Sequence, residues 1–135
     1  MKTILIIVVV AIMACTQTGA KYSEDSISYK VYKIDSINSY YLIYANRKDS
    51  LYKIVSKKES VKNCNPIQKD HQYNFKLHSA LANRRIGGKE ILPQNSLLVN
   101  CFFYDESTSI CFEGDSIRDL HYADNIKGLC FKEKQ

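Results

Sequence analysis

The order of apolar and polar side chains predicts a series of short β-strands from residue 27 onwards. Residues 27–34 alternate between apolar and polar side chains, which is the pattern of a strand with one buried face. Residues 40–45 are apolar on both faces, as is typical of a central strand, and residues 51–56 form another β-rich run. Because only the polar residues 46–50 separate these two runs, we expect them to form a hairpin.

The second half of the chain continues this pattern. Residues 73–77 alternate between aromatic or aliphatic and polar side chains and predict one half-buried strand. Residues 97–104 and 109–112 predict a second hairpin, and residues 126–131 predict a last strand.

Two segments depart from the strand pattern. Residues 116–122 predict one or two helical turns, capped by Asp115 or Ser116. Residues 83–96 contain a Gly pair and a Pro and predict a loop. Six or seven strands at this spacing predict an all-β fold, or a β-rich fold with one short helix. A small barrel or sandwich is the expected architecture, and the strand order is compatible with an OB-like barrel.

The N-terminus follows a different pattern from the rest of the chain. Residues 4–14 contain no charged or polar side chain and follow a single Lys at position 2. A membrane-spanning helix needs about 20 apolar residues, so this run is too short to be one and instead matches a secretory signal peptide. A buried N-terminal strand is the alternative, but the polar stretch 16–28 separates the run from the predicted strands.

Two cleavage sites are compatible with this signal. The sequence Ile12-Met13-Ala14-Cys15 ends the apolar run and resembles the lipobox of bacterial lipoproteins. That resemblance implies that Cys15 becomes the first residue and carries a diacylglyceryl thioether. Ordinary cleavage after Ala20, with plain secretion, is the alternative. The predicted organisation is therefore a signal peptide over residues 1–14, a lipidated Cys and flexible tether over 15–28, and one β-rich domain over 29–135.

The signal, the lipobox at residues 12–15 and the β-rich remainder together resemble the small lipoproteins of Bacteroidota. The resemblance implies a location and no activity. Thr16, rather than Asp, follows Cys15, and in lipoproteins this is typical of sorting to the outer membrane. Acidic residues directly behind the Cys, which are typical of surface export, are missing from the sequence, so a periplasm-facing position is expected.

The number of cysteines is odd, with five in 135 residues. If Cys15 carries lipid, four remain, and in an exported protein an even set predicts two disulfides. A hairpin in which paired residue numbers sum to about 212 places Cys101 opposite Cys111, which leaves Cys64 to pair with Cys130. The alternative is that some of these thiols stay free and buried.

No motif for catalysis, phosphate binding or metal binding is found in the sequence. The cysteines lack the close pairs that zinc sites use, and the three histidines are scattered, so no metal and no cofactor are expected. His78 is predicted on the outward face of its strand and His121 in a surface turn. An enzyme is therefore not the favoured class, and no catalytic residue is assigned.

The formal net charge is +5, with the basic residues distributed over separate predicted loops. An exported protein rarely meets nucleic acid, so no nucleic-acid partner is expected. Solvated loops, or attraction of the tethered domain to anionic lipid headgroups, explain the charge. The hydrophobic fraction of 45% and the low Gly and Pro content exclude disordered and collagen-like classes.

Tyrosine is unusually frequent, with ten Tyr against five Phe. Four of the tyrosines in the first strands are candidates for a recognition face that binds an envelope protein or a glycan: Tyr40, Tyr41, Tyr44 and Tyr52. The β-propensity of Tyr is the plainer explanation. The sequence thus favours a membrane-anchored accessory module that binds a partner, of an inhibitor or immunity type. A structural envelope protein and a secreted β-domain are the alternatives.

Overall fold

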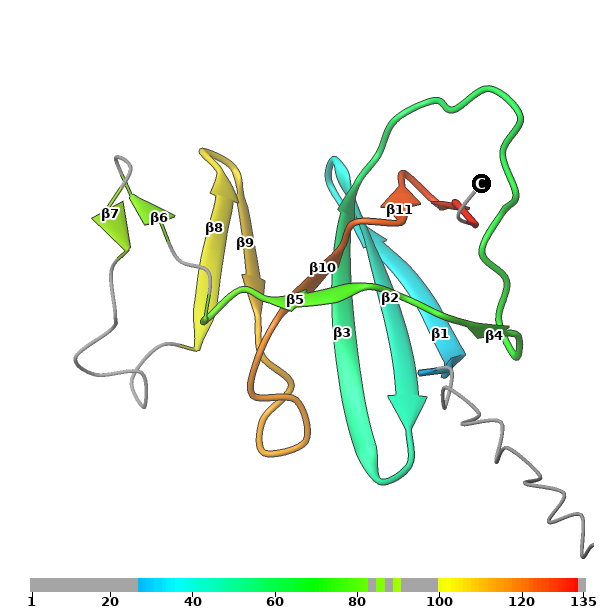
Figure 1. The fold of residues 1–135 in the computed structure, drawn as a ribbon. Coiled ribbons are helices and arrows are strands. Elements are labelled where there is room, and N and C mark those ends of the chain that lie inside the picture. The colour runs from blue at the N-terminus through cyan, green and yellow to red at the C-terminus, as the bar shows by residue number, and fades with distance from the viewer. Residues whose placement is uncertain (1–26, 83–84, 87–88, 91–99, 134–135) are drawn as a thin grey trace, which may run out of the picture.

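The computed structural model describes residues 27–82, 85–86, 89–90 and 100–133. Within these residues every regular element is a β-strand, which confirms the all-β prediction (Figure 1). No described segment forms a helix long and apolar enough to cross a membrane. The strands are β1 (Tyr29–Ile37), β2 (Tyr40–Arg47), β3 (Ser50–Lys57), β4 (Gln72–Tyr73), β5 (Leu77–Ser79), β6 (Arg85–Ile86), β7 (Lys89–Glu90), β8 (Cys101–Asp105), β9 (Thr108–Cys111), β10 (His121–Ala123), β11 (Ile126–Lys127) and β12 (Cys130–Phe131).

The first three strands form an antiparallel meander with tight turns. Asn38 and Lys48, the first residues of the two connecting turns, have φ values of 47° and 52°. Positive φ at this position is typical of the two-residue turns that match the right-handed twist of a hairpin. The predicted polar loop over residues 46–50 is thus shorter than expected, because Arg47 and Ser50 remain paired in the ladder.

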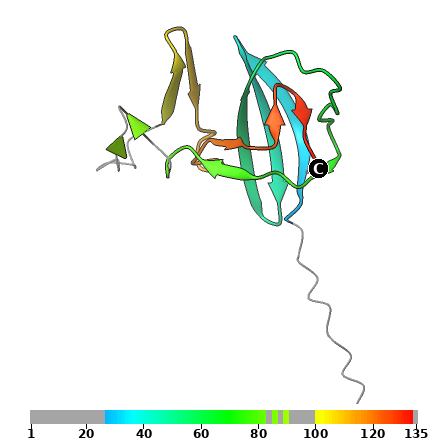
Figure 2. The ribbon, with the colours of Figure 1, turned by 45° about the horizontal axis from the view of Figure 1, so that its top comes forward.

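The main sheet has the order β4-β1-β2-β3-β10-β5. All its pairs are antiparallel except β3–β10, which meet in parallel through Ile54 and His121. The edge strands β4 and β5 belong to one stretch, residues 72–79, whose first end pairs with β1 and whose second end pairs with β10. This stretch therefore runs across the open side of the curled sheet (Figures 1 and 2). Taken as the fourth strand, it completes the order first, second, third, fifth, fourth of an OB-like barrel.

Two apolar clusters pack on the opposite faces of the central strands. The first fills the inside of the curled sheet and consists of Tyr29, Val31, Ile43, Ala45, Ile54, Ile67, Phe75 and Phe131. The second lies between the sheet and the β8–β9 hairpin and consists of Tyr40, Leu42, Tyr44, Val55, Phe102, Ile110, Ile117 and Leu120. Because both faces of β2 are covered, the run of apolar residues that identified it as a central strand is confirmed.

Three local predictions are wrong. Residues 116–122 form no helix, because Glu113 and Ile117 pair as an isolated bridge and β10 begins at His121. The predicted last strand, residues 126–131, is a hairpin instead, and its turn at Gly128 has a φ of 58°. The stretch 73–77 keeps the predicted alternation of buried and exposed side chains, but it is not one strand, because only its two ends pair, with β1 and with β10.

The β8–β9 hairpin has the predicted register. Cys101 faces Cys111, and Phe102 faces Ile110. The expected start of this hairpin at residue 97 and most of the predicted loop over 83–96 lie outside the described residues. The signal peptide and the tether up to residue 26 also lie outside them.

Candidate functional site: a braced polar groove

Both predicted disulfides are present. The Cys64–Cys130 bond joins the β3–β4 connection to β12, and the Cys101–Cys111 bond joins β8 to β9. These two bonds use four of the five cysteines of the chain, and the fifth, Cys15, lies outside the described residues.

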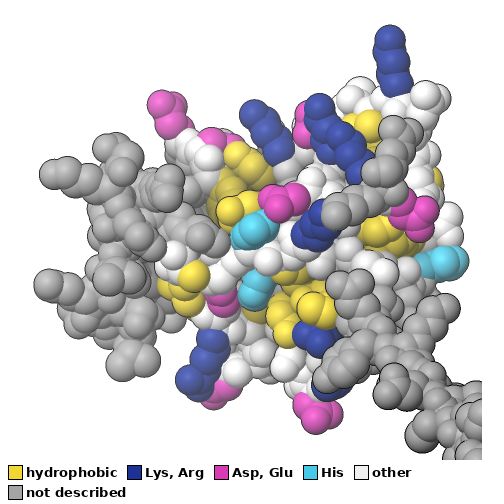
Figure 3. All heavy atoms as spheres, viewed as in Figure 1, with side chains coloured by type: hydrophobic (Ala, Val, Ile, Leu, Met, Phe, Trp, Pro, Cys, Tyr) yellow, Lys and Arg dark blue, Asp and Glu magenta, His cyan; other side chains and the backbone are white. Residues whose placement is uncertain are grey.

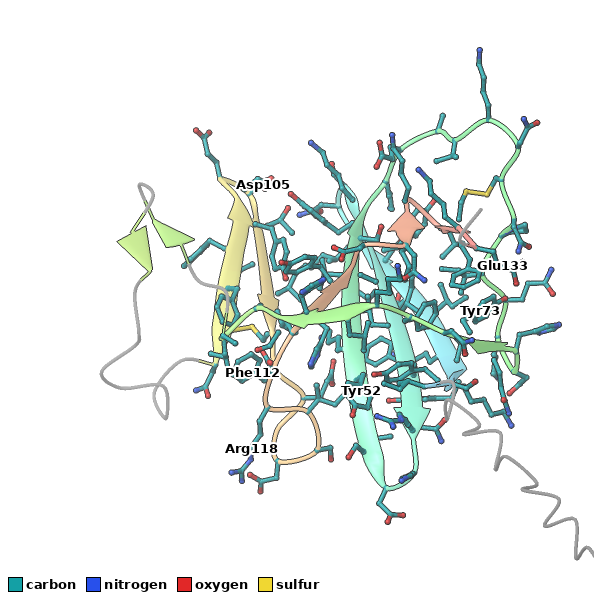
Figure 4. All side chains as sticks on the ribbon, in the orientation of Figure 1. Tyr52, Tyr73, Asp105, Phe112, Arg118 and Glu133 are labelled. Carbon is teal, nitrogen blue, oxygen red and sulfur yellow. A yellow bond between two sulfur atoms is a disulfide. The ribbon has the colours of Figure 1, made fainter. Side chains whose placement is uncertain are left out.

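A groove of about 550 Å³ lies beside the Cys64–Cys130 disulfide. It is formed by segments far apart in the sequence: the middle of the β3–β4 connection at Asn65, residues 72–76, the β10–β11 turn at residues 124–125, and residues 131–133. Figure 4 shows Tyr73 and Glu133, which line it, on the same side of the molecule as the chain terminus. A volume of this size is within the range of small-ligand sites.

Two devices hold the walls of the groove in place. On one side, the disulfide is supported by the amide of Phe131, which donates to the carbonyl of Asn65 at 2.8 Å. On the other side, the side-chain amide of Asn125 accepts from the backbone N–H of Lys76 at 2.9 Å and donates to the carbonyl of Asn74 at 2.9 Å. Asn125 therefore ties residues 74–76, between β4 and β5, to the start of the C-terminal hairpin.

The apolar part of the groove is aromatic. The rings of Tyr73 and Phe131 have centroids 5.1 Å apart, and Tyr73 also stacks on Phe75 at 5.3 Å. The Tyr73 hydroxyl accepts from the backbone N–H of Gln68 at 2.8 Å. The Tyr73 ring is thus fixed by three neighbours while its side chain stays half-buried at the groove.

The polar part of the groove contains amides and four charges. The Gln72 amide oxygen accepts from Ser28 at 3.2 Å, whereas the side-chain amides of Asn65 and Asn74 have no hydrogen-bond partner within the described part of the chain. The charged side chains are Lys76, Lys132, Asp124 and Glu133. Their formal charges cancel. Figure 3 likewise shows basic and acidic side chains interspersed over this view of the surface.

His78 contacts Asp124, one of the residues that line the groove. Its Nε2 lies 2.7 Å from Oδ2 of Asp124, and its ring stacks on Tyr122 at 4.9 Å. Its side chain is 39% exposed, so the outward-facing position predicted from the sequence is confirmed. The contact orients the Asp124 carboxylate at the groove wall.

The other predicted surface histidine is placed differently. His121 lies in β10, not in a surface turn, and its side chain is only 16% exposed because it packs edge-on against Tyr52. Its Nδ1 is buried and has no hydrogen-bond partner among the residues that the structure describes. Burial lowers the pKa of His121, and the nearby Asp119 carboxylate opposes this shift.

The group around His121 also contains Ser79. The Ser79 hydroxyl donates to Oδ2 of Asp119 at 2.5 Å, and the same oxygen lies 3.7 Å from Nε2 of His121. The carboxylate thus lies between the hydroxyl and the imidazole. In a serine triad the imidazole must lie between them, because it takes the proton of the nucleophile. These contacts link β5 to the segment before β10 and differ in order from a serine triad.

Lys53 forms a second polar cluster that the sequence analysis missed. Its Nζ donates to Oε1 of Glu113 at 2.6 Å and to the carbonyl of Cys111 at 2.9 Å, and the hydroxyl of Tyr44 donates to the same Glu113 oxygen at 2.9 Å. The hydrogen bond from Lys53 holds the pKa of Glu113 below its ordinary value, and burial raises the pKa of Tyr44. The position of Lys53 on the same strand face as the buried Val55 was the available signal.

The predicted tyrosine face is not formed. Tyr40 and Tyr44 are buried in the second cluster, under the β8–β9 hairpin, and they point away from Tyr41 and Tyr52 on the opposite face. Successive residues of a strand alternate between its two faces, and each face here is covered by another part of the chain. Tyr40, Tyr44 and Tyr52 therefore pack within the apolar clusters, and the four tyrosines do not make one exposed surface.

Comparison with known proteins identifies no relative of the chain. No family model, no curated protein and no solved structure matches the chain. Over the residues that the structure describes, no three His, Cys, Asp or Glu side chains gather in a cluster that could hold a metal ion. The groove and the cysteines are the features of the molecule that bear on its function.

Proposed function

We propose that the chain is an exported lipoprotein of the cell envelope that acts by binding a ligand in the groove. The cysteine pairing supports this most directly. Two disulfides use four cysteines and leave Cys15, which ends the apolar run of residues 4–14. Structural disulfides persist in oxidising compartments, and the remaining cysteine is the one that a lipobox would lipidate.

The anchor follows from the chemistry of acylation. Each buried CH₂ contributes about 0.8 kcal/mol, so two or three acyl chains on Cys15 would hold the protein on the membrane. A flexible tether over residues 16–28 would give the domain a reach of roughly 20 Å from the bilayer. Within this proposal the protein resides at the outer membrane and faces the periplasm. Secretion without an anchor is the alternative.

Binding is favoured over catalysis by the groove and by the polar clusters. The groove is concave and braced, with an aromatic wall and two amides that have no partner among the described residues. These are features of a preformed ligand site. The hydroxyl, carboxylate and imidazole around Asp119 do not have the order of a serine triad. An inhibitor or immunity-type role would be exercised by occupying the groove with part of the target.

Metabolic labelling tests the anchor. Cells that express the full chain are fed an alkyne fatty acid, and the protein is examined for label and for membrane association. We expect the wild type to be labelled and membrane-bound, and Cys15→Ser to be unlabelled and released. Thr16→Ser, one residue further on, is the matched control and should behave as the wild type. Membrane retention of unlabelled Cys15→Ser would rule out the lipid anchor.

Mass spectrometry without reduction tests the export half of the proposal on the same samples. Purified protein should lack four hydrogens relative to the reduced form, because both disulfides are closed. A full complement of thiols in protein taken directly from cells would contradict residence in an oxidising compartment.

A further inference from the structure

We propose that the groove beside the Cys64–Cys130 disulfide binds a short neutral oligosaccharide. This inference rests on the proposed binding function and names the class of its ligand. It is carried by three properties of the groove: balanced charge, two amide side chains without partners among the described residues, and a fixed aromatic ring.

The charge of the groove argues for a neutral ligand. Lys76 and Lys132 bring two positive charges, and Asp124 and Glu133 bring two negative charges. A polyanion such as a nucleic acid would be attracted by the lysines and repelled to a similar extent by the carboxylates, so it would gain little binding free energy. The formal net charge of +5 belongs to the whole chain and is not concentrated at this site.

The amides argue for a ligand with many hydroxyl groups. A side-chain amide offers both donors and an acceptor, which matches a sugar hydroxyl that also donates and accepts. Gln72 and Asn125 already bond within the protein and form part of the frame. Asn65 and Asn74, in contrast, have no side-chain partner in the described residues, although their backbone carbonyls are held by hydrogen bonds. Their backbones are therefore preorganised while their amides stay available, which lowers the entropic cost of binding.

The aromatic wall supplies the apolar contact that a sugar ring requires. A pyranose presents C–H groups on its faces, and these gain dispersion energy against a flat ring. Tyr73 is held by Phe75, by Phe131 and by the bond from Gln68, so its ring loses little freedom on contact with a ligand.

The groove is less suited to a peptide ligand than to a sugar. Peptides that add to a sheet edge gain most from main-chain pairing along several residues. The edge strand at the groove, β4, is only two residues long, and residues 74–76 directly after it belong to no strand. Recognition must therefore come from side chains, and the side chains present match hydroxyl groups.

Isothermal calorimetry with the full mature chain in detergent tests the ligand class. The probes are tetrasaccharides of glucose, mannose and N-acetylglucosamine, with a heparin-derived tetrasaccharide and an unstructured octapeptide as comparators. We expect saturable binding of at least one neutral tetrasaccharide and weaker binding of both comparators. Binding of none of the neutral tetrasaccharides, or tighter binding of the heparin fragment or the peptide, would overturn the proposal.

Variants locate the binding. Asn65→Ala and Asn74→Ala should each lower the affinity for the neutral tetrasaccharide by about fivefold, because each variant loses one or two hydrogen bonds to it. Asn100→Ala removes an exposed amide outside the groove and should leave the affinity unchanged. Unchanged affinity in both groove variants would place the ligand elsewhere and overturn the assignment. Fatty-acid labelling of Cys15 is scored separately, so failure of the ligand class is distinguished from failure of the envelope location.

Discussion

Lys53 and Glu113 form an ion pair across two layers of the fold, with Nζ 2.6 Å from Oε1. Lys53 points from β3 into the second apolar cluster and is 4% exposed, whereas the Glu113 side chain is 46% exposed just after β9. The ammonium group is satisfied by this carboxylate and by the carbonyl of Cys111. The pair thus links the β8–β9 hairpin to the central sheet at a point where apolar contact surrounds the lysine.

Removal of the carboxylate charge should destabilise the protein more than removal of both charges. Glu113→Gln leaves a buried ammonium without its counter-charge, and we expect a loss of about 3 kcal/mol in the free energy of unfolding. Lys53→Met combined with Glu113→Gln should recover much of this loss, because no buried charge remains. Denaturant unfolding with intact disulfides measures both. Glu106→Gln, in the exposed β8–β9 turn, is the control. A double variant no more stable than Glu113→Gln would show that Lys53 contributes chiefly through packing.

Asn125 should matter for stability and Asn74 should not. Asn125→Ala removes the two hydrogen bonds that tie residues 74 and 76 to the β10–β11 turn, and we expect a loss of roughly 1–3 kcal/mol. Asn74→Ala removes a side chain without a partner in the described residues and should change stability by less than about 0.5 kcal/mol. Thermal unfolding of the two variants makes the comparison. Equal effects would mean that the Asn125 bonds do not hold the groove wall.

Two glycines with similar backbone angles should respond differently to a methyl group. Gly114 and Gly128 have φ values of 55° and 58°. A Cβ at Gly114 meets nothing within 4 Å, whereas at Gly128 it would lie 2.6 Å from the carbonyl oxygen of Glu59. Gly114→Ala should therefore lower the free energy of unfolding by about 1 kcal/mol, from the backbone conformation alone. Gly128→Ala should lose clearly more, because the backbone of residue 59 must move. Chemical unfolding measures the loss of stability in each variant. Equal losses would contradict the close approach of Gly128 to the carbonyl oxygen of Glu59.

The pH dependence of stability near neutrality should be governed in part by His121. Burial lowers its pKa from the ordinary value of 6.5, so the folded state binds the proton less readily than the unfolded state. Stability attributed to His121 is thus complete above about pH 6.5 and decreases as the pH falls below that value. His121→Phe keeps an aromatic ring against Tyr52 and should flatten the stability profile between about pH 7 and 5. His71→Gln, at an exposed position, should not. A profile unchanged by His121→Phe would contradict the role of its burial.

Those features that depend on neighbours in the sequence were predictable. The apolar residues on both faces of β2 indicated a central strand, because successive side chains alternate between faces that must both be covered. The pairing of Cys101 with Cys111 followed from hairpin register, and exclusion then left Cys64 for Cys130. The resemblance of residues 12–15 to a lipobox is likewise a local pattern, and lipidation of Cys15 remains a prediction.

The groove could not be predicted in this way. Its walls come from four segments, and neither Asn65 nor Asn125 carries a local signal that places it beside Tyr73. The same limit applies to the tyrosines. The pattern of the first strands indicated which side chains share a face, but not that the β8–β9 hairpin covers the face of Tyr40 and Tyr44. The helix predicted over residues 116–122 failed because the bridge of Glu113 with Ile117 and the pairing of β10 set its backbone.

By itself, the sequence determined the β-class, the central meander, the register of one hairpin and the pairing of four cysteines. These depend on side-chain alternation, turn chemistry and counting, all of which act over a few residues or by exclusion. Only the tertiary structure decided how residues 72–79 reach from β1 to β10, what covers each face of the sheet, and where a groove is left. The physical reason is that an apolar face must be buried, while the partner that buries it is chosen by the path of the whole chain.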